Sequence, residues 1–184
     1  KQNLIDGLSK REFIFSKFYT VIALALISTF FVFIVSIILG YSYSDFNEFS
    51  IVTTDLEYLL AFFIKLVGFF SFGLFMGILV KRSAFAVGGI LVWFFGESIL
   101  KGYLFWQFKD LDETTERVNS IMQFLPLESI SNLIKEPFTR LSAVQTVAKQ
   151  VGEDLSKDFS VQPLDLLIVL VWTAVFIYLS YILL

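Results

Sequence analysis

Three charged side chains that could carry chemistry lie inside stretches of sequence that are otherwise apolar: Lys65, Glu97 and Lys101. Counted from the expected outer ends of their helices at ~1.5 Å per residue, Lys65 and Glu97 lie roughly 12–14 Å deep. A single charge at the centre of a bilayer costs at least ~2.5–3.5 kcal/mol. These groups therefore either form a structural ion cluster or lie beside a polar transport path.

The two deep charges should pair with each other. Lys65 and Glu97 lie on consecutive apolar stretches joined by the short turn Lys81–Ser83, and we expect so short a turn to hold two antiparallel helices side by side. An unpartnered charge in hydrocarbon is far less stable than a charge pair. We predict a Lys65–Glu97 contact, direct or through one water, with Lys101 one turn away as a second partner for Glu97.

The residue types that are absent exclude several kinds of site. The chain has no cysteine and no histidine, which excludes disulfides, thiolate or imidazole metal sites, and Cys–His or Ser–His nucleophiles. The formal net charge is −3, and no basic run is long enough to indicate nucleic-acid binding. The phosphate-binding sequence Gly-x-x-x-x-Gly-Lys-Ser/Thr is also absent. We assign no catalytic, cofactor-binding or metal-binding residue and do not expect an enzyme.

Four long apolar runs must position the charges. Hydrophobic residues make up 57% of the 184 residues and charged residues 17%, against ~25% charged in an average soluble domain. The runs cover 18–40, 57–80, 84–106 and 164–184, and each reaches the roughly 20 residues that a helix needs to cross ~30 Å of hydrocarbon. Each run is apolar on every face, which excludes the alternation of a β-barrel strand. We predict an all-α, polytopic membrane protein with four transmembrane helices.

The distribution of lysine and arginine predicts the orientation. Segment 1–17 carries four basic residues, and the turn after residue 80 carries Lys81 and Arg82, so both should face the cytoplasm. The connection 41–56 has no lysine or arginine, and segment 107–163 has a lower basic density over a greater length. The predicted organisation is a cytoplasmic segment 1–17, three spans within 18–106, an extracytoplasmic segment 107–163 and a last span 164–184.

The extracytoplasmic segment 107–163 is expected to be helical. Apolar residues recur at helical spacing over 141–155 and, more weakly, over 112–125, and a third short helix is predicted over 128–135, closed by Pro137. Two placements stay open. The helices either lie on the outer leaflet or on the spans, or part of 124–134 dips back into the membrane, which is stable only where protein surrounds the re-entrant backbone.

Two glycines in the second run have the spacing of a helix-packing motif. Gly73-x-x-x-Gly77 places two residues without side chains on one helix face, which lets a neighbouring backbone approach closely. We expect this face to pack tightly within the chain.

The cytoplasmic segment contains a helix-start pattern. Ser9 followed by Glu12 is a capping box, in which the serine accepts from the Glu12 backbone N–H and the glutamate reaches back to the serine. Leu8 and Phe13 occupy the two hydrophobic-staple positions around it. We predict a turn before residue 8 and a helix that begins at Lys10.

This segment, from Gly7 to Phe13, reads Gly-Leu-Ser-Lys-Arg-Glu-Phe, and Ser16-Lys17 then leads into a span. It resembles the segment after the second span of ABC-2 type transporter permeases. In that family the segment forms a short coupling helix that docks on a separate ATPase subunit, and four spans follow with a helical outer segment between the last two. The resemblance implies that the four runs are spans three to six of a six-span permease and that the chain is the C-terminal part of a longer protein. It assigns ATPase coupling to Leu8, Ser9, Lys10, Arg11, Glu12 and Phe13. Of these, Leu8, Arg11 and Phe13 are the residues expected to contact the ATPase.

The resemblance also implies the partners and the energy source. In this family two permease subunits, identical or different, pair with two ATPase subunits, and ATP and Mg are held by the ATPases. The permease halves tilt between inward-facing and outward-facing arrangements and usually export a substrate. The implied location is the bacterial cytoplasmic (inner) membrane, with lipid as a further partner and no nucleic acid.

Three other functions stay open from the residues alone. The chain could be an accessory or scaffold membrane protein without transport activity. It could be an ion-coupled transporter that uses Lys65 and Glu97 as a charge relay, or a membrane-embedded enzyme built on lysine, serine or paired acids. Two further spans upstream of Lys1, or co-purification of an ATPase subunit, would distinguish a permease from all three.

Overall fold

The computed structural model describes residues 9–43, 56–109, 114–135, 144–147 and 160–184. In these ranges every element of regular secondary structure is a helix, which confirms the all-α prediction. The principal helices, in chain order, are α2 (Lys10–Tyr43), α4 (Glu57–Val80), α5 (Ser83–Phe108), α6 (Thr114–Met122), α7 (Pro126–Asn132) and α9 (Pro163–Leu183).

Four of these helices are long and apolar enough to cross a membrane, namely α2, α4, α5 from Ala84 onward, and α9. They coincide with the four runs predicted from the sequence, and the chain is an integral membrane protein. Many of their large apolar side chains are exposed, among them Phe30 on α2 and Phe94 on α5. Contiguous apolar surface of this kind is covered by lipid or by a partner.

Helix α2 is continuous over 34 residues, which makes it ~51 Å long at 1.5 Å per residue. The predicted division at residue 17 between a coupling helix and a span is therefore not a break in the backbone. The sequence holds no proline or glycine in this stretch before Gly40. At the junction, the hydroxyls of Ser16 and Thr20 donate to the carbonyls of Phe13 and Ser16, each at 3.0 Å. Because α2 exceeds the ~30 Å hydrocarbon thickness, a rigid end of the helix extends beyond it.

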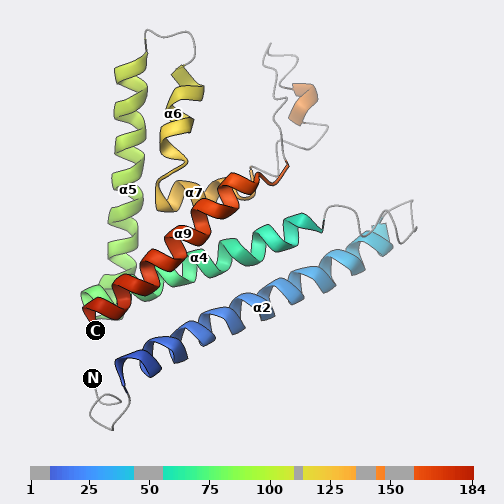
Figure 1. Cartoon of the computed structure of the whole chain (residues 1–184). Helices are drawn as coiled ribbons and strands as arrows, with labels where there is room; N and C mark the ends of the chain where they lie inside the picture. The colour runs from blue at the N-terminus through green and yellow to red at the C-terminus, as the bar shows by residue number, and fades with distance from the viewer. Residues whose placement is uncertain (1–8, 44–55, 110–113, 136–143, 148–159) are drawn as a thin grey trace.

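The central helix of the bundle is α4. It packs against α2 on one side and α9 on the other (Figure 1). The seam with α9 is aromatic: the Phe176 ring centroid lies 5.0 Å from that of Phe72 and 5.6 Å from that of Phe75. The seam with α2 has the smaller side chains Ala25 and Val67 at its buried centre, with Phe18, Phe63 and Phe70 packed against them. These two seams fix α2, α4 and α9 relative to one another.

A short left-handed turn joins α4 to α5. Lys81 has a φ of 59°, and its backbone N–H donates to the Gly77 carbonyl at 3.1 Å, which closes the last turn of α4. Arg82 is extended and precedes the first residue of α5. The turn is as short as predicted, but it does not hold the two helices side by side. Instead, α5 leaves α4 at a wide angle, and α7 contacts α4, α5 and α9 (Figure 1).

Two short helices follow α5. The helix predicted over 112–125 is α6, which packs along α5 (Figure 1). The helix predicted over 128–135 is α7, which begins earlier, because Pro126 takes the first helical position where its missing N–H is not needed. The predicted closing residue Pro137 lies outside the described residues. Of the helix predicted over 141–155, only 144–147 are described, and they are helical.

Close helix packing occurs at a glycine outside the predicted motif. A Cβ built on Gly73 or Gly77 meets no atom of the described residues within 4 Å, which contradicts, for this part of the chain, the prediction that the pair packs tightly. A Cβ on Gly68 would instead lie 2.9 Å from Val169 Cγ1, across the α4–α9 seam. The spacing alone is misleading because no described helix lies against the face that Gly73 and Gly77 share.

Replacing Gly68 with alanine should lower the free energy of unfolding. The new methyl group would overlap Val169, which is fully buried and β-branched, and overpacking typically costs about 1–3 kcal/mol. Gly89→Ala should be milder, because the atom it meets is Met76 Cε, the end of a flexible side chain. Gly73→Ala is the matched control and should be neutral or slightly stabilising. Equal losses at Gly68 and Gly73, measured by unfolding in bicelles, would contradict this packing.

Candidate functional site

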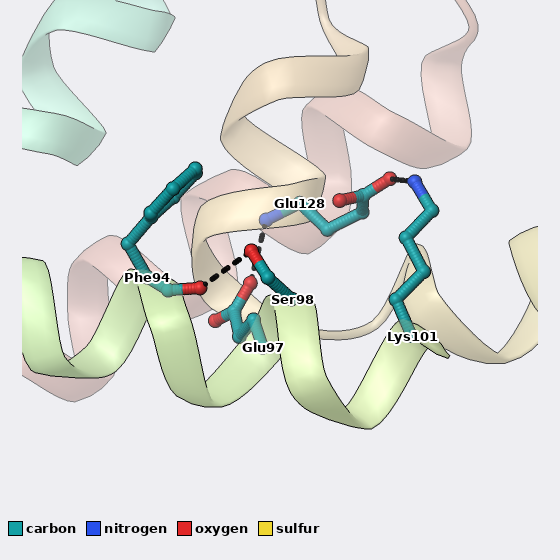
Figure 2. A network of polar contacts seen from close by, with 5 residues as sticks. All are labelled: Phe94, Glu97, Ser98, Lys101 and Glu128. Atoms are coloured by element: carbon teal, nitrogen blue, oxygen red, sulfur yellow. Dashed lines mark hydrogen bonds and ion pairs between the residues drawn. The ribbon is translucent and has the colours of Figure 1, made fainter. Parts of the chain in front are cut away.

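A buried carboxylate on α5 holds the start of α7. Glu97 is 8% exposed, and its carboxylate accepts from the backbone N–H groups of Leu127 at 3.2 Å and Glu128 at 3.0 Å. The indole N–H of Trp93, one turn earlier on α5, also donates to it, at 2.7 Å. The first N–H groups of a helix have no partner within the helix, and Leu125, which precedes α7, gives no side-chain cap. Glu97 therefore caps α7 from a different helix (Figure 2).

An ion pair lies beside this cap. Lys101 Nζ donates to Glu128 Oε1 at 2.6 Å, and the two side chains are only 35% and 23% exposed. Lys101 lies one turn beyond Glu97 on α5, and Glu128 belongs to the first turn of α7. The ion pair therefore joins the same two helices as the Glu97 cap (Figure 2).

A cation approaches the other end of α7. Lys65 Nζ, from α4, donates to the backbone carbonyl of Ser131 at 3.3 Å. The last carbonyls of a helix lack partners within the helix, and positive charge is stabilising there, as negative charge is at the N-terminal end. The helix is thus held by Glu97 at its start and by Lys65 near its end. We call Lys65, Glu97, Lys101 and Glu128, together with α7, the α7 site.

The predicted direct ion pair between Lys65 and Glu97 is wrong. Within the ranges that the structure describes, the one ion pair is Lys101–Glu128, so Lys101 is not the second partner of Glu97 either. The reason is α7, which supplies backbone donors to Glu97 and a backbone acceptor to Lys65. The prediction took α4 and α5 to be direct neighbours at this level, whereas each charge meets α7 instead.

Contacts from three helices fix the level of α7 along them. From α9, Trp172 Nε1 donates to the carbonyl of Phe124, just before α7, at 2.8 Å. At ~1.5 Å per residue, Trp172 is ~13 Å from the start of α9, Lys65 ~12 Å from the start of α4, and Glu97 ~16 Å from the end of α5. The α6–α7 segment therefore meets the three long helices well inside their ends.

A polar cavity of about 680 Å³ opens beside the ion pair. Two cations and two carboxylates line it: Lys101, Lys135, Glu128 and Asp165. Amide and hydroxyl side chains complete its polar lining: Asn119, Ser120, Gln123, Ser131, Asn132 and Gln162. Because the four formal charges cancel, the cavity suits water or a polar ligand without net charge.

The predicted capping box at the start of α2 is confirmed. The Glu12 backbone N–H donates to Ser9 Oγ at 3.3 Å. In return, Glu12 Oε2 accepts from the backbone N–H and from the hydroxyl of Ser9, each at 2.8 Å. Both residues are exposed, so this pattern fixes where the helix begins without any contact to another helix.

The other predicted coupling residues differ in their exposure. Lys10 and Arg11 are exposed and Phe13 is half-buried. The Arg11 guanidinium lies over the Phe15 ring, 5.5 Å from its centroid. Leu8 lies outside the described residues, and the predicted hydrophobic staple with it. The described part of the segment therefore presents two cations at the N-terminal end of α2.

Replacing Ser9 with alanine should loosen the first turn of α2. The change removes the N-cap acceptor, which is worth about 1 kcal/mol, so the amide of Glu12 should exchange its hydrogen about fivefold faster. Ser16→Ala is the control, since the Ser16 hydroxyl donates to a carbonyl inside the helix and caps nothing. Equal acceleration of amide exchange by both variants would show that the cap does not hold the helix start.

Sequence reasoning missed two members of the α7 site, Glu128 and Ser131, and the two tryptophans that donate to Glu97 and to the Phe124 carbonyl, Trp93 and Trp172. The signal for Glu128 is present, because Pro126 followed by an acid two residues later is typical of a first helical turn. The two indole N–H groups were also a signal, since a tryptophan in an apolar segment needs an acceptor. The Ser131 contact uses a backbone carbonyl, for which side-chain identity gives no signal.

Within the described residues, no group of three or more histidine, cysteine or acidic side chains could hold a metal ion. Comparison of the chain with protein-family models, curated proteins and solved structures finds no match. Function is therefore inferred from the α7 site and from the rigid start of α2.

Proposed function

We propose that the chain is a membrane-spanning permease subunit of an ABC-2 type transporter, which exports its substrate by alternating access. The observation that carries the proposal is the α7 site, a charged and hydrogen-bonded segment that meets α4, α5 and α9 well inside their ends. Ionisable groups within membrane spans are rare and commonly mark the paths of ions or polar substrates.

On this proposal the α6–α7 segment re-enters the membrane from the outer side. Irregular backbone and helix ends are tolerated at membrane depth only where protein or water satisfies their polar groups. Glu97, Lys65 and Trp172 supply such partners to the two ends of α7 and to the turn before it. The neighbouring polar cavity then offers a hydrophilic surface to substrate on the outer half of the path.

The start of α2 is the proposed link to a separate ATPase subunit, which holds ATP and Mg. Residues 10–17 continue the span as one rigid helix, so movement of their exposed end is transmitted to the seam that α2 forms with α4. Lys10 and Arg11 give this end a positive charge suited to an acidic surface on the ATPase. A second permease subunit and two ATPases complete the proposed assembly, in the bacterial cytoplasmic membrane.

Purification of the full-length, tagged protein from its native membrane tests the proposal. We expect a subunit with a phosphate-binding loop to co-purify with it and to hydrolyse ATP. Lys10→Glu should lower the recovery of that subunit at least tenfold, because it reverses a charge on the proposed contact. Arg82→Glu is the matched control: it makes the same reversal of charge on the same predicted side of the membrane, in the α4–α5 turn, and should leave recovery unchanged.

Two results would contradict the proposal. A folded protein that purifies without any ATPase subunit would favour an accessory or scaffold role. Equal losses for Lys10→Glu and Arg82→Glu would show that general charge at the cytoplasmic face, and not the start of α2, controls the association.

A further inference from the structure

A second cavity, of about 510 Å³, lies between the first turns of α2 and the last turns of α9. These two helix ends lie at the same end of the bundle (Figure 1). Its walls are apolar: Ile14 and Phe15 come from α2, and Ala174 and Ile177 from α9. The cavity is therefore a groove on the predicted cytoplasmic half of the bundle, open to the surroundings of the helices.

The polar groups of the groove come from three side chains. Tyr178 and Tyr181 line it from α9, and Arg11 lines it from α2. Arg11 forms no ion pair with a carboxylate in the part of the chain that the structure describes. The carboxylate next to it in sequence, Glu12, is bound to Ser9. The groove thus combines apolar walls with a cation that no acidic side chain of the described residues neutralises.

The position of Arg11 in the sequence predicts that its charge lies at the level of lipid headgroups. Arg11 precedes the uncharged run, which begins at Phe18, by ~10 Å at 1.5 Å per residue. Arginine and tyrosine are both typical of the membrane–water interface, and basic residues near the cytoplasmic leaflet attract anionic lipids. Lys10 and Lys17 add to the positive potential of this helix end.

We propose that this groove binds one anionic phospholipid of the cytoplasmic leaflet. An acyl chain lies along the walls formed by Ile14 and Ile177, and the phosphate accepts hydrogen bonds from the Arg11 guanidinium. The apolar walls match the acyl chain, and the single cation matches one phosphate. The inference goes beyond the proposed transport function and needs no ATPase partner.

Native mass spectrometry of the full chain tests the site, with the protein released from micelles that contain equal amounts of phosphatidylglycerol and phosphatidylcholine. We expect one phosphatidylglycerol to be retained in preference. Arg11→Gln should reduce that preference about fivefold, the factor that corresponds to about 1 kcal/mol per basic residue near an anionic surface. Arg11→Lys should retain most of the preference. Ala174→Trp should abolish binding of this lipid, because the indole fills the groove.

Arg82→Gln is the matched control. The Arg82 guanidinium also lies over a phenylalanine ring, 6.0 Å from the Phe85 centroid, on the same predicted side of the membrane but outside the groove. The Arg82→Gln variant should keep the wild-type preference for phosphatidylglycerol. The proposal is overturned if Arg11→Gln and Arg82→Gln behave alike, if folded Ala174→Trp protein keeps the preference, or if cysteines placed at Ala174 cross-link two copies of the chain.

Discussion

Replacing Glu97 with leucine is expected to lower the free energy of unfolding by about 3 kcal/mol or more. The change leaves the indole N–H of Trp93 and the backbone N–H groups of Leu127 and Glu128 without their acceptor, and each unsatisfied buried donor costs about 1–3 kcal/mol. Glu97→Gln keeps one acceptor oxygen and should lose less. The measurement is reversible unfolding in bicelles, followed by tryptophan fluorescence.

Ser98→Ala is the control for this prediction. Ser98 neighbours Glu97 on α5, is exposed, and donates only within its own helix, to the Phe94 carbonyl at 2.9 Å (Figure 2). Its loss should change stability by a few tenths of a kcal/mol, as is usual for an exposed position. If Glu97→Leu is as mild as Ser98→Ala, then Glu97 does not hold α7 in place.

The second large effect is expected at the α4–α9 seam. Phe176 is buried and contacts Phe72, Phe75 and Trp172 through ring centroids 5.0–5.6 Å apart. Phe176→Ala should cost about 2–3 kcal/mol, because the deleted ring leaves a cavity of roughly 100 Å³ at the centre of this cluster and each Å³ costs about 24 cal/mol. Since lipid is as apolar as the core, the loss reflects packing rather than transfer from water.

Leu170→Ala provides the comparison for Phe176. Leu170 lies on the same helix but is 52% exposed, so lipid replaces the deleted atoms and little stability should be lost. Unfolding in the same bicelles measures both variants. Similar losses at the two positions would mean that α9 is not held through the aromatic seam.

The spans and the start of α2 could be predicted from the sequence because both depend on local information. Four apolar runs suffice to place four long helices, and the Ser9–Glu12 pattern fixes the first residue of α2 through contacts three residues apart. The bound at residue 17 between the cytoplasmic segment and the first span falls inside α2, because an apolar stretch and a charged stretch can share one helix when no proline or glycine divides them.

The partners of the buried charges could not be predicted from the sequence. Lys65, Glu97 and Lys101 were identified as site residues, but their partners lie on α7, which is distant in sequence. Three of the contacts use backbone groups, which no sequence pattern marks. The packing prediction for Gly73 and Gly77 was inaccurate for a related reason: their spacing describes one helix face and not what lies against that face.

The central claim is that the α6–α7 segment lies inside the membrane. The chain has no native cysteine, so a spin label can be attached at single cysteines replacing Phe124, Leu170 and Ser160, all of which are exposed. The ratio of relaxation by oxygen to relaxation by a water-soluble nickel complex reports depth in a bilayer. We predict that the label at position 124 matches the buried depth of the label at 170, while the label at 160 is at the surface. A label at 124 that is as accessible to nickel as the label at 160 would contradict the claim.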